Sequence, residues 1–228
     1  MLDGPRLPPL RGPARELIVL CHGYGADGND LIALGREWQR ALPHAGFASP
    51  HAPERCEQSP SGFQWFGLAR LDPHETQAGV ERAAPYLDAF LNSEIERWAL
   101  PPERMALLGF SQGAMMALHV GLRRSRSPAA IVGFSGLLVA PEQLPELSAP
   151  PPILLLHGTD DQVIPDAALF AAAVALGAAG AAVQWHRTPG LGHGIDAEGM
   201  VLAGRFLADA FAGRLTPRSL PLACRNPA

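Results

Sequence analysis

The stretch MALLGFSQGAMMAL, residues 105–118, decides the fold. Its first part, Met105 to Leu108, is a short apolar run typical of a buried strand, and residues 113–120 have the small and apolar side chains of a helix. Between them stands Gly109-x-Ser111-x-Gly113, which predicts a strand, a sharp turn and a helix. A side chain at either glycine would strike the neighbouring strand or helix, and the turn holds Ser111 in a strained conformation out from the sheet.

This turn makes Ser111 a candidate nucleophile. The helix that begins at Gln112 directs its free N–H groups at the space in front of the hydroxyl, where an oxyanion forms during acyl transfer. The alternative is an ordinary strand-to-helix turn whose serine caps the helix. A second serine, in Gly133-Phe-Ser-Gly136, lacks the spacing because a glycine follows Ser135 directly. We interpret Ser135 as a strand-end serine.

Composition indicates a soluble globular chain. With 228 residues and 47% hydrophobic content, we expect a single α/β domain over residues 1–228, with residues 1–14 and 216–228 as extended, frayed arms. The formal net charge is −4 and no long basic run occurs, which argues against nucleic acid and anionic lipid as partners. The three cysteines have no metal-ligand spacing and favour reduced thiols in the cytoplasm, so no metal is expected.

One uncharged stretch, residues 167–183, approaches the length of a membrane span. It consists mostly of alanine, and Gly177 and Gly180 interrupt it. We therefore expect a helix, a turn and the start of a strand there, and no integral membrane segment.

Strand and helix patterns alternate along the chain. Strands are predicted at residues 16–21, 46–49, 105–108, 129–134, 153–156 and 183–188, and helices at about 30–42, 76–98, 113–120, 166–175 and 197–211. Asn29 or Asp30 is the expected N-cap of the first helix. This alternation predicts an α/β fold with a mainly parallel sheet flanked by helices on both faces. In such a sheet the functional groups gather at the carboxyl ends of the strands.

Four loops with reactive side chains follow predicted strands, at residues 22–24, 111, 160–161 and 193. A serine needs a base to take its proton, and that base needs an acid to orient it. The order serine, aspartate, histidine is the order of an α/β-hydrolase triad. His193, flanked by two glycines, is the expected base, whereas position alone does not choose between Asp160 and Asp161.

The first glycine-rich loop, HGYGADG at residues 22–28, has two interpretations. A phosphate-binding loop would need a P-loop lysine, which is absent. We therefore expect the backbone N–H of Tyr24 to be a second oxyanion donor beside that of Gln112. His22 and His157 both precede a glycine at a strand end, where we expect them to hydrogen-bond local backbone and brace their loops.

The loop of residues 53–74 contains Trp65 and Phe66. Their side chains either fill the core or line an apolar pocket for the acyl or alcohol part of a substrate.

These motifs together resemble the phospholipase/carboxylesterase family of α/β hydrolases, relatives of the acyl-protein thioesterases, over residues 16–211. The resemblance is carried by LCHGYGADGNDL at residues 20–31, GFSQG at 109–113, LHGTDDQVIP at 156–165 and GHG at 192–194. It implies an α/β-hydrolase fold without a large cap domain and selects Asp161, four residues before a proline, as the acid. It also implies His193 as the base, oxyanion donors at Tyr24 and Gln112, and a substrate-loop tryptophan at Trp65.

The sequence thus predicts a cofactor-free carboxylesterase with the triad Ser111, Asp161 and His193, which acts on a small-molecule ester or a lipid-like acyl substrate through an acyl-enzyme. A lysophospholipase or an acyl thioesterase is the near alternative. A non-catalytic hydrolase-fold protein that binds an apolar ligand is the alternative from another class. A homodimer is a further expectation.

Overall fold

The computed structural model describes residues 2–68, 72–144 and 149–215. A seven-stranded sheet forms the centre, in the order β1-β3-β2-β6-β7-β8-β9. Only β1 is antiparallel to its neighbour among these described strands, and all other pairs are parallel. The strands are β1 Arg6–Leu7, β2 Glu16–Cys21, β3 Ala45–Ala48, β6 Met105–Phe110, β7 Ala130–Phe134, β8 Ile153–Gly158 and β9 Val183–Thr188.

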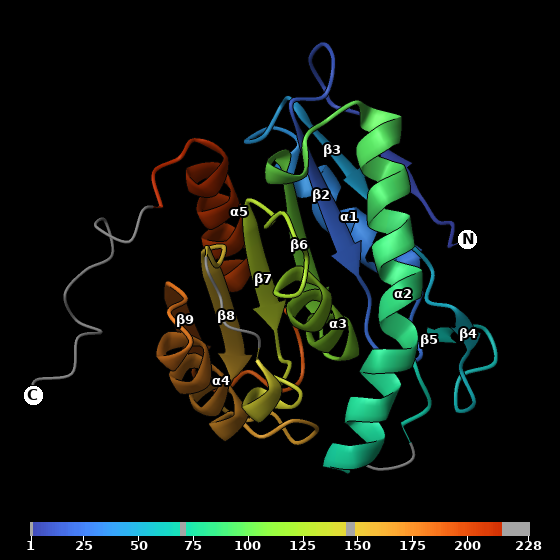
Figure 1. The fold of residues 1–228 in the computed structure, drawn as a ribbon, viewed down its shortest axis with the longest axis vertical. Helices are drawn as coiled ribbons and strands as arrows, with labels where there is room; N and C mark the ends of the chain where they lie inside the picture. The colour runs from blue at the N-terminus through green and yellow to red at the C-terminus, as the bar shows by residue number, and fades with distance from the viewer. Residues whose placement is uncertain (1, 69–71, 145–148, 216–228) are drawn as a thin grey trace, which may run out of the picture.

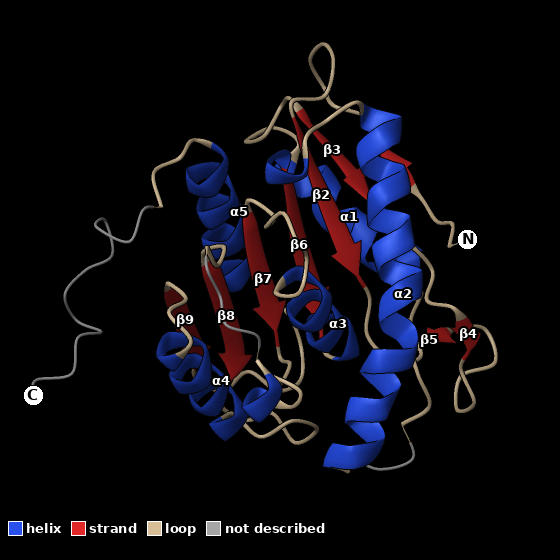
Figure 2. Ribbon diagram, viewed as in Figure 1, coloured by secondary structure: helices blue, strands red, loops and turns tan. Residues whose placement is uncertain are grey.

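Five α-helices of the described residues cover the two faces of this sheet. They are α1 Gly28–Trp38, α2 Pro73–Trp98, α3 Gln112–Gly121, α4 Ala167–Ala178 and α5 Ala197–Phe211. Helices α2, α3 and α4 lie on one face, and α1 and α5 lie on the other (Figure 1). The strands are layered between them (Figure 2), and a separate short hairpin of β4 Glu54–Arg55 and β5 Phe63–Gln64 lies in the loop before α2.

The core has two apolar layers because alternate residues of each strand face opposite sides. In β2, Leu17 and Val19 pack under α2 and α3, whereas Ile18 and Leu20 pack under α1 and α5. All four side chains are fully buried. Burial on both faces accounts for the continuous apolar runs that predicted the strands, and it fixes the strand ends that position the site.

The start of helix α1 differs from the prediction. Its N-cap is Asp27, not Asn29 or Asp30. The Asp27 carboxylate accepts a hydrogen bond from the amide of Asn29 at 2.6 Å, and the Asp30 carboxylate accepts one from the amide of Asp27 at 3.2 Å. This reciprocal capping box ends the glycine-rich loop at a fixed point.

The N-terminal segment is not the frayed arm that its proline and glycine content predicted. Residues Arg6 and Leu7 form strand β1 and pair with Ala48 and Phe47 of β3. The guanidinium of Arg6 also forms an ion pair at 2.7 Å with Glu94 of α2, whose side chain is fully buried. A buried carboxylate needs such a partner, so the start of the chain is held to the core. The predicted C-terminal arm, 216–228, lies outside the described residues.

Residues 167–183 form a helix, a turn and the start of a strand, as predicted. Helix α4 contributes twelve residues to this stretch and packs beside β8 and β9. No helix in the described part of the chain combines the length and the apolar character that crossing a membrane requires.

Candidate active site

Ser111 lies at the apex of the turn between β6 and α3. Its backbone has φ 55° and ψ −118°, a strained combination for a residue with a side chain. A Cβ on Gly109 would lie 2.1 Å from the carbonyl oxygen of Gly113, and a Cβ on Gly113 would lie 2.0 Å from that of Cys21. Both glycines are therefore required by close backbone approach, as the sequence predicted, and the hydroxyl is held at the carboxyl edge of the sheet.

The loop after β8 brings Asp161 against His193. Oδ2 of Asp161 lies 2.7 Å from Nδ1 of His193. Oδ1 of the same carboxylate accepts hydrogen bonds at 2.9 Å from the amides of Val163 and Ile164. Burial favours the protonated acid, but the hydrogen bond from His193 and the two amides outweigh it and lower the pKa of Asp161 below its ordinary value. The carboxylate is thus charged and fixed where it can orient an imidazole.

The neighbouring acid has a different environment. Asp160 is exposed, and its carboxylate accepts a hydrogen bond at 2.8 Å from the hydroxyl of Thr159. It is a turn residue with its side chain bonded locally. Position in the sequence did not separate the two aspartates, and the structure places only Asp161 against His193.

Two buried histidines brace the loops of the site. Nδ1 of His22 lies 2.8 Å from the carbonyl oxygen of Gly23, and Nε2 accepts a hydrogen bond from the amide of Ala52 at 3.0 Å. Burial lowers the pKa of His22, which keeps the ring neutral. Nε2 of His157 lies 2.8 Å from the carbonyl oxygen of Ile164 and 3.2 Å from Oδ2 of Asp161. The predicted local bracing by both histidines is confirmed.

The two predicted oxyanion donors lie on neighbouring loops. The amide of Gln112 is the first of helix α3, where N–H groups have no partner within the helix. The amide of Tyr24 follows the carboxyl end of β2, the strand next to β6. Gly113 approaches the carbonyl oxygens of Cys21 and His22 closely, so these loops are in direct contact. That contact brings the two loops together, and joint donation by the two amides to a negatively charged oxygen stays a prediction.

Trp65 connects these two loops. Its indole Nε1–H donates to the carbonyl oxygen of His22 at 2.9 Å, and its amide donates to Oε1 of Gln112 at 2.9 Å. Nε2 of Gln112 in turn donates to the carbonyl oxygen of Phe66 at 2.8 Å. The side chain of Gln112 therefore clamps the 65–66 backbone to the serine turn, a role that no local sequence signal predicted.

The side chains of Trp65 and Phe66 are 1% and 0% exposed. Phe66 packs tightly against Gly79 of α2, where an added Cβ would lie 2.3 Å from the ring. Both residues are part of the buried core, which was one of their two interpretations. Their predicted contact with a substrate stays a prediction.

The serine and histidine loops meet at the same edge. The ring of Phe110, the residue before Ser111, lies 4.9 Å from the imidazole of His193. Among the described residues no hydrogen bond joins the Ser111 hydroxyl to His193, although such bonds commonly tighten only in complexes with substrate. Ser135, with φ 46°, lies at the end of β7, and its hydroxyl is 3.5 Å from the carbonyl oxygen of Gly194. This strand-end serine supports the histidine loop, which the pattern around it did not reveal.

A parallel sheet with a strained serine turn at one strand end, and an aspartate–histidine pair two strands away at the same edge, defines an α/β-hydrolase fold. The sequence model of the Phospholipase/Carboxylesterase family matches residues 5–210. The chain belongs to this family.

Several proteins are similar to the chain over most of its length. The Escherichia coli esterase YpfH is 31% identical over 192 residues, with 84% of this chain and 81% of that protein covered. An acyl-protein thioesterase 1 of Gibberella zeae is 27% identical over 210 residues and covers 82% of this chain and 89% of its own. The crystal structure of esterase PE8 has a TM-score of 0.88 and 44% identity, with 92% of this chain and 99% of that chain covered. The chain is therefore a member of a hydrolase family whose named relatives include esterases and thioesterases.

Proposed function

We propose that this protein is a serine hydrolase that cleaves carboxylic esters through an acyl-enzyme. The hydrogen bond between Asp161 and His193 carries the proposal, because it supplies a fixed acid and an oriented base at the edge where Ser111 is held. No cofactor takes part in this mechanism.

The reaction follows from the positions of these groups. His193 accepts the proton of the Ser111 hydroxyl as its oxygen attacks the ester carbonyl, and Asp161 stabilises the imidazolium that forms. The amides of Tyr24 and Gln112 donate to the oxyanion of the tetrahedral intermediate. His193 then gives the proton to the departing alcohol. Water repeats the sequence on the acyl-enzyme and releases the acid.

The choice of esters over thioesters is supported by the relatives. The two named esterases are 44% and 31% identical to the chain, whereas the acyl-protein thioesterase of Gibberella zeae is 27% identical. The proposed substrate is a small-molecule ester or a lipid-like acyl ester in the cytoplasm. Thioesters and lysophospholipids are the second candidate, because the same groups act on them and relatives carry the thioesterase name.

The test of the serine mechanism is hydrolysis of nitrophenyl esters from acetyl to long acyl chains. Wild type should be active, and Ser111→Ala should lose the activity, whereas Ser127→Ala, at a distant serine bonded to the carbonyl of Ala149, should retain it. A fluorophosphonate probe should label wild type and not Ser111→Ala. A folded wild type that neither hydrolyses any ester nor reacts with the probe would support the non-catalytic binding protein instead.

A second assay separates the substrate classes. Ester, thioester and lysophospholipid with the same acyl chain are compared by kcat/KM. The proposal requires the ester to be the best of the three, and a preferred thioester would move the assignment to an acyl thioesterase. The expected homodimer is tested separately by light scattering. A monomeric mass would contradict that expectation.

A further inference from the structure

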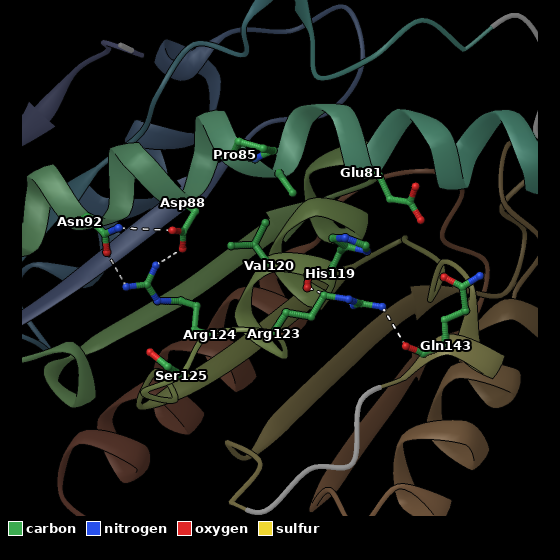
Figure 3. Close-up of a pocket in the computed structure, with 11 residues that line it drawn as sticks. Glu81, Pro85, Asp88, Asn92, His119, Val120, Arg123, Arg124, Ser125 and Gln143 are labelled. Atoms are coloured by element: carbon green, nitrogen blue, oxygen red, sulfur yellow. Dashed lines mark hydrogen bonds and ion pairs between the residues drawn. The ribbon is translucent and has the colours of Figure 1, made fainter.

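A cavity of about 700 Å³ lies between helix α2 and the carboxyl end of helix α3 (Figure 3), and Ser111 is not among its lining residues. Its middle is apolar, formed by Ala84, Pro85 and Val120. Charged and polar side chains surround this middle. They are Glu81, Asp88, Asn92, His119, Arg123, Arg124, Ser125 and Gln143. The volume is within the range of small-molecule sites, on the order of 300–1,000 Å³.

Two buried nitrogen atoms in the cavity wall lack hydrogen-bond partners among the described residues. They are Nδ1 of His119 and Nε of Arg124. His119 is only 7% exposed, and burial lowers its pKa to about 4, so the ring is neutral at pH 7. The terminal nitrogens of Arg124 are already bonded to Asp88 and Asn92. Buried polar atoms are almost always satisfied in folded proteins. Nε of Arg124 is a donor and lacks an acceptor, and Nδ1 of His119 lacks one in the tautomer that carries its proton there.

Arg123 adds a positive charge without a carboxylate partner in the described structure. Its guanidinium donates only to backbone carbonyl oxygens, that of His119 at 3.1 Å and that of Gln143 at 3.2 Å. Burial lowers the pKa of Arg123, and the charge of Glu81 acts in the opposite direction without overcoming it. The charged form of Arg123 would be stabilised by an anion in contact with it.

Figure 3 shows how these groups are distributed. His119 and Arg123 lie next to each other, whereas Arg124 lies on the far side of Val120. A ligand that satisfies both groups has an acceptor at each end and an apolar middle. The positive charges of the two arginines are offset by the negative charges of Glu81 and Asp88 in the same wall. This disfavours a ligand with two negative charges.

We propose that this cavity binds a small monocarboxylate that has a second hydrogen-bond acceptor, such as a hydroxyl or carbonyl oxygen, at its other end. The planar carboxylate fits the guanidinium of Arg123 and accepts from His119. The second acceptor reaches Nε of Arg124, and the hydrocarbon between them covers Val120 and Pro85.

The cavity is separate from the proposed catalytic groups. Ser111 precedes the first residue of α3 and His119 lies near the end of this helix, eight residues further on, so the two residues are about 12 Å apart along the helix axis. Removal of Arg123 should therefore leave ester hydrolysis and fluorophosphonate labelling of Ser111 unchanged. Binding at the cavity is recognised by its weakening in Arg123→Gln, and labelling of Ser111 reports on the active site.

The test is titration calorimetry with three probes of one chain length. They are 6-hydroxyhexanoate, hexanoate and 1-hexanol. At constant ionic strength, 6-hydroxyhexanoate should bind most tightly, hexanoate more weakly and 1-hexanol not at all. Arg123→Gln should weaken the binding of 6-hydroxyhexanoate about tenfold or more, because a charge-assisted hydrogen bond is lost.

Two further variants make the test specific. Glu81→Gln should tighten binding of both carboxylates, since it removes a facing negative charge. Arg36→Gln, at an exposed position of α1 on the other face of the sheet, should change nothing. Equal affinity in wild type and Arg123→Gln, or binding of 1-hexanol as tight as that of hexanoate, would overturn the proposal. If circular dichroism shows that Arg123→Gln does not fold, the Glu81→Gln variant decides. An affinity for the carboxylates equal to that of wild type would then overturn the proposal.

Discussion

Nδ1 of His193 lies 2.7 Å from Oδ2 of Asp161, although 32 residues separate them in the chain. The contact joins the loop after β8 to the loop after β9, two neighbouring parallel strands. Because both loops leave the same edge of the sheet, the topology brings the acid and the base together. The two amide hydrogen bonds to Oδ1 then fix the carboxylate in the orientation that the imidazole needs.

Asp161→Asn should therefore impair the proposed reaction far more than Asp160→Asn. An amide in place of the carboxylate favours the wrong tautomer of His193 and does not stabilise its charged form, which reduces kcat by about 10⁴-fold in a comparable triad. Among the described residues the Asp160 carboxylate accepts a hydrogen bond only from the Thr159 hydroxyl in the same turn, so its substitution by asparagine should leave kcat unchanged. Steady-state kinetics on one nitrophenyl ester measures kcat for both variants. A large loss in Asp160→Asn with none in Asp161→Asn would reverse the assignment.

Trp65 should act as a positioning residue for the oxyanion donors. Trp65→Phe keeps most of the buried ring and removes only the N–H that donates to the carbonyl of His22. The spacing between the Tyr24 and Gln112 amides should relax, and kcat should fall about tenfold with little change in KM, because these amides act mainly in the transition state.

The control for this change is Trp185→Phe, at a tryptophan on β9 that is 46% exposed. It should alter neither kinetic constant. A purely structural role of Trp65 predicts a lower melting temperature with unchanged kcat, so the two readouts distinguish positioning from packing.

Much of the site follows from the sequence because its groups depend on local chain geometry. Gly109 approaches the backbone of Gly113 in the same turn, whereas Gly113 approaches the carbonyl oxygen of Cys21 at the end of the neighbouring strand. Both requirements fall on glycines of one five-residue turn, so they leave a fixed spacing in the sequence. The choice between Asp160 and Asp161 depends on which carboxylate faces the His193 loop. That orientation is set by amides and by a loop 32 residues away, so position alone could not give it.

Other features could not be predicted because they also depend on contacts between segments that are distant in the chain. Strand β1 has only two residues, too few for a pattern, and it is fixed by pairing with β3 and by the buried partner Glu94. The clamp by the Gln112 side chain and the cavity beside His119 arise where distant segments pack together. None of these contacts leaves a periodic or motif signal in the residues that form them.

Glu94→Gln should destabilise the protein by about 3 kcal/mol, because it leaves the guanidinium of Arg6 without its buried partner. Glu103→Gln is the matched control. Its ion pair with Arg126 is exposed on both sides and should cost about 0–1 kcal/mol. Urea unfolding at pH 7 measures both changes. Equal, small losses would mean that the Arg6–Glu94 pair does not hold the N-terminal segment.

The same pair predicts the pH dependence of stability. Burial favours protonated Glu94, but hydrogen bonds from Arg6 and Trp98 outweigh it and place the pKa below the ordinary 4.5. A carboxyl whose pKa is lowered on folding contributes fully above its unfolded value, and the contribution is lost as the pH falls below about 4.5 through the lower folded value. Wild type should therefore lose stability more steeply than Glu94→Gln in this acidic range. Parallel curves for the two proteins would contradict this account.

Replacement by alanine should have opposite effects on stability at two glycines that lie in helices. Gly177, in the last turn of α4, has nothing within 4 Å of the position of an added Cβ. Gly177→Ala should therefore stabilise the protein by about 0.5–1 kcal/mol, because alanine loses less backbone entropy in a helix. Gly113→Ala would place its Cβ 2.0 Å from the carbonyl oxygen of Cys21, where only backbone movement relieves the clash.

That movement would separate α3 from the loop after β2, with a cost of about 3 kcal/mol or more. It would also displace the Gln112 amide from the Tyr24 amide, so activity should fall in molecules that remain folded. Thermal unfolding and ester hydrolysis of the two variants test this directly. If Gly113→Ala were as stable and as active as Gly177→Ala, close approach of the two loops would not be what requires a glycine after Ser111, and the proposed oxyanion site would lose its structural basis.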